Sequence, residues 1–213
     1  LFPQLLDALR DRRTLMMVLL SSVAMGPVVL VLLSALVSGM EKRAEARELV
    51  AVATERDAIF EALCRGARSR ARFACVFTLH GEVAFGRVAL EDGWLERQQV
   101  GRVSVPLDRA STFRSVAKGR QPHIGALGDP AVTNDPLRAL GRRPPVPCAL
   151  LAILLRGRPV ALLYLDDDGR ALSEALPGEL QPLLSEVGQA FQRLVQQAKS
   201  GGLGGLDDFD AIA

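Results

Sequence analysis

Two apolar runs around a short polar turn constrain the fold of this chain more than any other feature. They occupy Val146 to Gly169 and flank Arg-Gly-Arg-Pro at residues 156–159. Each run has the length of a strand and is too short to cross a membrane by itself. Arg156 and Gly157 supply a turn, and Asp-Asp-Asp-Gly at residues 166–169 ends the second run because these residues disfavour β-structure. The segment therefore predicts a β-hairpin that closes a buried sheet.

A different apolar stretch, Leu15 to Met40, carries no charged residue and has the character of a membrane span. A helix needs roughly 20 apolar residues to cross a bilayer core of about 30 Å. Gly26 and Pro27 predict a kink in its middle, which membrane helices tolerate. Before it, residues 1–14 combine apolar positions at helical spacing with charged ones, as expected for a helix in the membrane interface. We expect one transmembrane helix over 15–40, with a cleaved signal peptide or a buried core helix as alternatives.

The remaining residues predict helices and strands in a mixed order. Residues 125–147 are rich in Gly, Pro, Asp and Asn and predict a mobile connection with one helical turn at Leu137–Leu140. Residues 200–213 predict a flexible acidic tail. The other expected elements are a helix over 41–72, strands over 73–79, 82–90, 103–107 and 121–124, a helix capped at Ser111-Thr112 that runs through Lys118, and a last helix that begins between Ser173 and Pro182 and ends at Lys199. This order predicts an α+β fold over 73–199, an antiparallel sheet with the flanking helices packed on one face.

Charge and cysteine content restrict partners only weakly. The net charge of +2 is close to balance, so it neither demands nor excludes an anionic partner. The basic cluster Arg65-Gly-Ala-Arg-Ser-Arg-Ala-Arg72 is compatible with anionic lipid or nucleic acid, but a solvated helix end explains it as well. We therefore expect no nucleic-acid partner. Three widely spaced cysteines, an odd number without a Cys-x-x-Cys motif, favour a reducing compartment and buried thiols.

The sequence offers no convincing catalytic or metal site. His80 and His123 lack a recognisable nucleophile motif nearby, and the histidines and cysteines lack zinc-ligand spacing. The turn at residues 166–169 fails the EF-hand pattern because no glutamate follows at the required position. We expect a chain that is not an enzyme and holds no metal, with an undetected enzyme as the alternative, which a His123 substitution without loss of activity would weaken further.

A small-molecule ligand, if one binds, would lie between the sheet and the irregular residues 91–145, where helices leave one face incompletely covered. The candidate ligand contacts there are Trp94, Phe113, His123 and Tyr164. Each of these residues also suits a place in the core, and the cofactor is unknown.

Five segments between residues 49 and 199 carry a resemblance to a known family. They are Glu55-Arg-Asp-Ala-Ile-Phe-Glu-Ala-Leu, Gly66-Ala-Arg-Ser-Arg-Ala-Arg-Phe, Leu140-Gly-Arg-Arg-Pro-Pro, Arg156-Gly-Arg-Pro-Val-Ala-Leu-Leu-Tyr-Leu-Asp and Val187-Gly-Gln-Ala-Phe-Gln-Arg-Leu. They resemble GAF-like domains of δ-proteobacterial, for example myxobacterial, signalling proteins. The resemblance implies a cytoplasmic sensory or protein-interaction domain whose first and last helices pair between subunits in a homodimer. The Asn-Lys-Phe-Asp-Glu signature of cyclic-nucleotide-binding GAF domains and a cysteine placed to hold a bilin are missing, so neither ligand is implied.

Residues 1–49 resemble a different family. Ala8-Leu-Arg-Asp-Arg-Arg-Thr-Leu-Met-Met, the apolar span and Glu41-Lys-Arg-Ala-Glu-Ala-Arg are similar to the N-terminus of sodium-efflux-type ABC-2 transporter permeases. Such permeases have several further spans that this sequence lacks. Two hypotheses follow: a sensory domain anchored in the inner membrane through Leu15–Met40, or a permease-derived fragment or fusion without transport activity. The first places the globular domain in the cytoplasm and the second places it outside, and the positive charges flanking the span do not decide between them.

Overall fold

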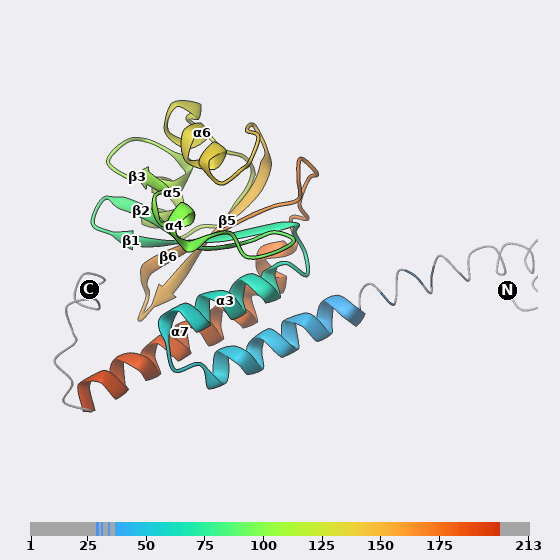
Figure 1. Ribbon diagram of the computed structural model, residues 1–213, viewed down its shortest axis with the longest axis vertical. Coiled ribbons are helices and arrows are strands. Elements are labelled where there is room, and N and C mark those ends of the chain that lie inside the picture. Colours follow the sequence, from blue (N-terminus) through green and yellow to red (C-terminus); the bar gives the residue numbers. More distant parts are fainter. Residues whose placement is uncertain (1–28, 30, 32–33, 35–36, 201–213) are drawn as a thin grey trace, which may run out of the picture. The chain divides into compact units, whose positions relative to one another are not determined.

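The computed structural model describes residues 29, 31, 34 and 37–200 (Figure 1). The chain divides into a unit that ends at Glu41 and a compact unit that begins at Lys42. The predicted interfacial helix, most of the predicted span over Leu15–Met40 and nearly all of the predicted tail lie outside the described residues. Within the described part, no helix is both long and apolar enough to cross a bilayer.

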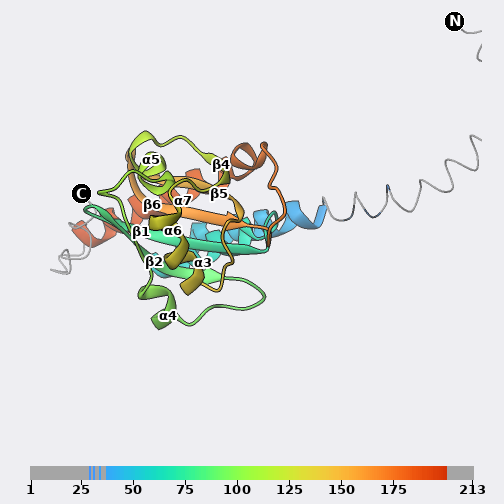
Figure 2. The same cartoon turned by 90° about the horizontal axis from the view of Figure 1, so that it is seen from above.

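The compact unit is built on one antiparallel sheet of six strands in the order β3-β2-β1-β6-β5-β4 (Figures 1 and 2). The strands are β1 (Phe73–His80), β2 (Val83–Leu90), β3 (Ser104–Pro106), β4 (His123–Ala126), β5 (Pro147–Leu155) and β6 (Arg158–Asp166). The predicted hairpin is confirmed as β5 and β6, which lie in the middle of the sheet because β6 also pairs with β1. Arg156 and Gly157 both have positive φ angles, 51° and 77°, as the tight turns favoured between antiparallel strands require.

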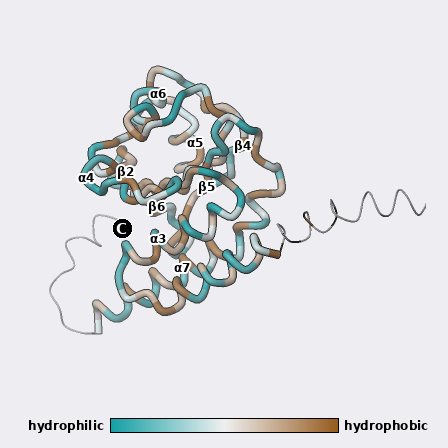
Figure 3. Tube along the Cα trace, turned by 45° about the vertical axis from the view of Figure 1, so that its right-hand side comes forward, coloured by the Kyte–Doolittle hydropathy of each residue, from teal (hydrophilic) through white to brown (hydrophobic). Residues whose placement is uncertain are grey.

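Helices α3 (Arg56–Ala67) and α7 (Leu176–Ser200) cover one face of the sheet (Figure 1). A third helical segment, residues 42–52, here called the leading helix, packs against these two helices. The prediction of one helix over 41–72 is wrong, because the chain turns at residues 53–55. The turn lets apolar side chains on both sides of it, Val50 and Ile59, reach full burial in the same core. Hydrophilic and hydrophobic residues alternate along α7 (Figure 3), as expected for a helix with one face on a core.

Two glycines allow this helical layer to pack closely. A Cβ atom at Gly66 would stand 2.6 Å from Leu183 Cδ2 in α7 and 2.7 Å from Ala46 Cβ in the leading helix. A Cβ atom at Gly188 of α7 would stand 2.8 Å from the Leu154 carbonyl oxygen of β5. Side chains larger than hydrogen at these positions would push the helices apart or off the sheet.

The flanking helices α3 and α7 pack together on that face, as predicted, and the opposite face is covered by loops and short helices. These helices are α4 (Arg97–Gly101), α5 (Thr112–Gly119) and α6 (Pro130–Ala139). The predicted cap of α5 is confirmed, since the Ser111 hydroxyl accepts a hydrogen bond of 3.2 Å from the Arg114 backbone N–H. Helix α6 replaces the predicted mobile connection because Pro130 starts a helix and Val132 and Leu137 bury its inner side.

Candidate functional site

The four predicted ligand contacts occupy different environments. Phe113 and Tyr164 are fully buried beneath the short helices, where Phe113 meets Phe77 edge-on at 5.2 Å between ring centroids. Trp94 lies after β2 and keeps 41% of its surface exposed. His123 is half-buried on the edge strand β4, and its Nε2 lies 3.0 Å from the Ala126 carbonyl oxygen. The structure therefore places two of the four in one core and two at separate surface positions.

The face predicted to hold a ligand is filled by apolar side chains. One buried cluster there joins aromatic residues of the sheet with residues of α5 and α6, among them Phe73, Phe77, Phe113, Leu137 and Tyr164. A ligand at this face stays a prediction, and binding would require these side chains to rearrange.

A buried ion-pair cluster on the same face was not predicted from the sequence. Arg142 has 5% of its side chain exposed and donates from Nε to Asp166 Oδ2 at 2.9 Å. Its Nη2 also donates to Asp166 Oδ1, and its Nη1 donates to Glu91 Oε1 at 2.6 Å. The guanidinium lies 4.6 Å from the ring centroid of Phe73. Arg142 thus ties the loop after α6 to the ends of β6 and β2.

The local structure explains how Arg142 reaches this position. Gly141 ends α6 with a φ of 78°, and the backbone N–H groups of Gly141 and Arg142 donate to the carbonyls of Arg138 and Leu137. This is the glycine-terminated helix end in which two carbonyls of the last turn are satisfied. The Gly-Arg sequence after an apolar helical stretch is the signal that could have located it, although nothing in the sequence identified Asp166 as the partner.

In this cluster the positive charge of Arg142 faces more than one carboxylate of the protein itself. Burial lowers the pKa of Arg142, but hydrogen bonds and charge from Asp166 and Glu91 outweigh it and hold the pKa above its ordinary value. Burial, followed by the charge of Asp166, raises the pKa of Tyr164. The Tyr164 hydroxyl has no hydrogen-bond partner with suitable geometry among the described residues. Arg142 therefore acts as a structural pin whose guanidinium is occupied by Asp166 and Glu91.

The cysteines are poorly suited to nucleophilic chemistry. Cys64, Cys75 and Cys148 are all buried and unpaired. Burial, then the charge of Asp166, raises the pKa of Cys148 to about 12, and burial raises the pKa values of the other two thiols as well. A cysteine reacts as the thiolate, so these thiols are held in the unreactive form near neutral pH. The described residues also contain no group of three or more metal-binding side chains.

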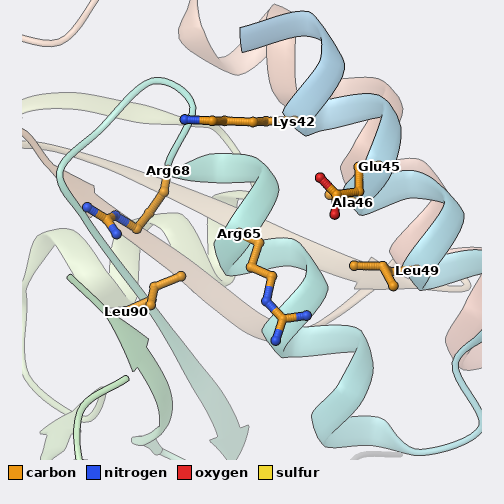
Figure 4. Close-up of a pocket in the computed structure, with 7 residues that line it drawn as sticks. All are labelled: Lys42, Glu45, Ala46, Leu49, Arg65, Arg68 and Leu90. Carbon is orange, nitrogen blue, oxygen red and sulfur yellow. The ribbon is translucent and has the colours of Figure 1, made fainter. Parts of the chain in front are cut away.

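An open hollow of about 320 Å³ lies on the helical side of the molecule (Figure 4). It is bounded by the leading helix, α3 and the end of β2, and its lining residues are Lys42, Glu45, Ala46, Leu49, Arg65, Arg68 and Leu90. Three of the seven are cationic, so this hollow, here called the basic hollow, favours an anionic occupant. A smaller hollow of about 220 Å³ lies between α4 and the end of α6.

Solved structures of GAF domains superpose on this chain. The GAF domain of a Coxiella burnetii phosphoenolpyruvate-protein phosphotransferase superposes with a TM-score of 0.58 at 11% identity, covering 77% of this chain and 96% of that one. Its Acinetobacter counterpart gives a TM-score of 0.56 at 11% identity, covering 79% and 97%. The chain has a GAF-like fold.

The same fold is also found in an enzyme. Free methionine-R-sulfoxide reductase from Neisseria meningitidis, solved with its substrate, gives a TM-score of 0.56 at 15% identity and covers 74% of this chain and 90% of that one. The sequence matches no protein-family model and no curated protein. At these identities the comparisons establish the fold and leave the activity to be argued from this chain's own residues.

Proposed function

We propose that this chain is a membrane-anchored, non-catalytic sensory or protein-interaction module of bacterial signalling that works through its first and last helices. Leu15–Met40 supplies the anchor in the inner membrane, and the compact unit lies in the cytoplasm. The GAF-like fold supports the sensory role by analogy. The buried thiols support the absence of cysteine-based catalysis.

The observation that carries this proposal is the way the leading helix is fastened to α7. Arg43 Nη1 lies 3.2 Å from Glu179 Oε2, and Arg47 Nε donates to Glu186 Oε1 at 2.6 Å. These two ion pairs and the contact of Arg193 described next are called the helix clasp.

Arg193 closes the clasp at the far end of the leading helix. Its Nη2 donates to the carbonyl oxygens of Val50 and Ala51 at 3.1 and 3.0 Å. Carbonyls in the last turn of a helix lack partners within the helix, so this contact caps the leading helix as well as tethering it. The acidic and basic clasp residues of α7 recur every seventh position, on one side of the helix.

The clasp couples the two ends of the compact unit. The leading helix and α7 run in the same direction (Figure 1), and the clasp joins them at three places along their length. A displacement of one helix would therefore be transmitted to the other. Since α7 packs on β5 at Gly188, the sheet is part of the same mechanical unit. A homodimer that forms through α7 and the leading helix would carry such a displacement between subunits.

Protease access to the Gly201–Gly205 linker in sealed membrane vesicles tests this proposal. We expect cleavage in inside-out vesicles and protection in right-side-out vesicles, because the proposal places the compact unit in the cytoplasm. The reverse pattern would contradict the proposal and favour the permease-derived alternative, which places the domain outside.

Cross-linking tests the dimer separately. The variant Gln189→Cys adds an exposed thiol on α7, whereas Arg109→Cys adds one on the opposite face. In native membranes we expect a disulfide-linked dimer for the first variant and monomers for the second. Monomers for both variants would contradict signalling through paired helices.

A further inference from the structure

The basic hollow brings together cations from two consecutive helices that are joined by the turn at residues 53–55. Lys42 belongs to the leading helix, and Arg65 and Arg68 lie at the end of α3. Figure 4 shows their side chains around one opening between these helices and the end of β2. Glu45 is the one carboxylate among the seven lining residues. The hollow is therefore positive on balance and open to solvent.

The neighbouring charges leave this excess in place. Arg68 Nη2 lies 3.4 Å from Asp92 Oδ1, but Asp92 is fully exposed, and such surface pairs are weak. Glu179 is shared by Arg43 and Arg70, at 3.2 and 2.6 Å. Two cations on one carboxylate add a further positive charge to the same end of the molecule.

An exposed aromatic side chain stands at the rim of the basic hollow. Trp94, the single tryptophan of the chain, pairs through its backbone with Leu90, which lines the hollow. The Cζ atom of Arg65 lies over the Trp94 ring, 5.4 Å from the ring centroid. Exposed Trp beside Lys and Arg is the combination found where proteins meet the headgroup region of a bilayer.

We propose that the basic hollow and Trp94 form a docking surface for anionic phospholipid headgroups. This inference rests on the proposed membrane attachment, because only Glu41 separates Lys42 from the end of the predicted span at Met40. Anionic lipids attract basic residues close to the membrane, and the attraction grows with each Lys or Arg. Lipid docking would hold α3 and the leading helix against the bilayer and so fix the orientation of the compact unit.

The single tryptophan makes the proposal measurable in the full chain. The chain is placed in nanodiscs of phosphatidylcholine alone or of phosphatidylcholine mixed with phosphatidylglycerol, each with and without brominated acyl chains. We expect a blue shift of Trp94 emission and quenching by bromine in the anionic discs, and neither in the neutral discs. The anionic effect should fall as salt concentration rises.

Two variants of equal charge change give the control. Lys42→Gln with Arg68→Gln removes cations of the hollow and keeps Arg65 against Trp94, whereas Arg109→Gln with Arg120→Gln removes exposed charges near α5. We expect the first pair to reduce quenching to the level of neutral discs and the second pair to leave it unchanged. Equal quenching in both disc types, or equal loss in both variants, would overturn the proposal.

Two further experiments distinguish lipid binding from the binding of soluble anions, and failure of the hollow from failure of the anchor. If inorganic phosphate shifts Trp94 emission equally in neutral discs, the hollow binds soluble anions and the lipid proposal is wrong. If the chain enters no disc, the proposed anchor fails, and co-sedimentation with anionic against neutral vesicles then tests the hollow alone. The lipid proposal would still be supported if the chain prefers anionic vesicles and the double variant Lys42→Gln, Arg68→Gln loses that preference.

Discussion

The two faces of the sheet are held by different means. On the helical face, long helices approach closely at Gly66 and Gly188, and the clasp lies near the surface. On the opposite face, short helices and loops rest on aromatic side chains and are pinned by the buried Arg142–Asp166 pair. The close packing of the helical face suits helices that shift together. The short helices and loops of the opposite face can open only if the buried Arg142–Asp166 pair breaks. Under the proposed function, transmission belongs to the helical face, and the opposite face has the pinned cover.

The largest expected effect comes from breaking the pin of the opposite face. Arg142→Met leaves Asp166 buried without its partner, which should lower the free energy of unfolding by about 3–5 kcal/mol. Urea unfolding of the full chain in detergent measures it, with the exposed neighbour Arg143→Met as control. The double variant Arg142→Met, Asp166→Leu should recover part of the loss. A loss below about 1 kcal/mol in the single variant would show that the pair is not the pin.

Overpacking the helical face should have the next largest effect. Gly66→Ala places a methyl group against Leu183 and Ala46, so we expect a loss of about 1–3 kcal/mol in the same unfolding experiment. Gly93→Ala is the matched control, because a Cβ there meets no atom within 4 Å. Equal stabilities of the two variants would mean that the helices of this face can separate at little cost.

Removing the cap of α5 tests how far the opposite face depends on local hydrogen bonds. Ser111→Ala removes the acceptor for the Arg114 backbone N–H and should cost about 1 kcal/mol. Ser115→Ala, at an exposed position inside the same helix, should leave stability unchanged or slightly higher. If both substitutions have the same effect, the cap does not hold this helix.

The smallest expected effect is a pH dependence from the buried thiols. In the folded chain Cys148 keeps its proton until about pH 12, whereas in the unfolded chain it ionises near its ordinary pKa of 9.0. The unfolded state therefore loses this proton first, so the contribution of Cys148 to stability stays constant below about pH 8 and falls above it. Comparing Cys148→Ala with the unchanged chain at pH 7 and 9.5 should show a flatter decline for the variant, by less than about 1 kcal/mol. Parallel profiles would mean that the thiol is not shielded.

Local sequence patterns predicted the β5–β6 hairpin and the α5 cap, because each is determined by residues that are neighbours in the sequence. The Arg156-Gly157 turn and the Ser111 cap each depend on a few consecutive positions. The turn at residues 53–55 was missed because both flanking segments favour helix and neither glycine nor proline marks the break. The turn forms because it allows Val50 before it and Ile59 after it to be buried in the same core.

The Arg142–Asp166 pin and the helix clasp depend on contacts between distant segments. Arg142 and Asp166 are separated by 24 positions, and Arg193 lies 143 positions from Val50. No periodicity links such pairs, so the pin and the clasp required the structure. Trp94 was singled out from the sequence as a ligand contact, but only the fold brings Arg65 to its ring.

Hydrogen–deuterium exchange of the full chain tests most directly whether the leading helix and α7 form one unit. We predict that residues 42–52 exchange as slowly as α7 in the unchanged chain. In Glu186→Gln with Arg193→Gln, residues 42–52 should exchange several-fold faster while β5 and β6 are unaffected. Rapid exchange of residues 42–52 in the unchanged chain, or no response to the two substitutions, would contradict the coupling of the terminal helices.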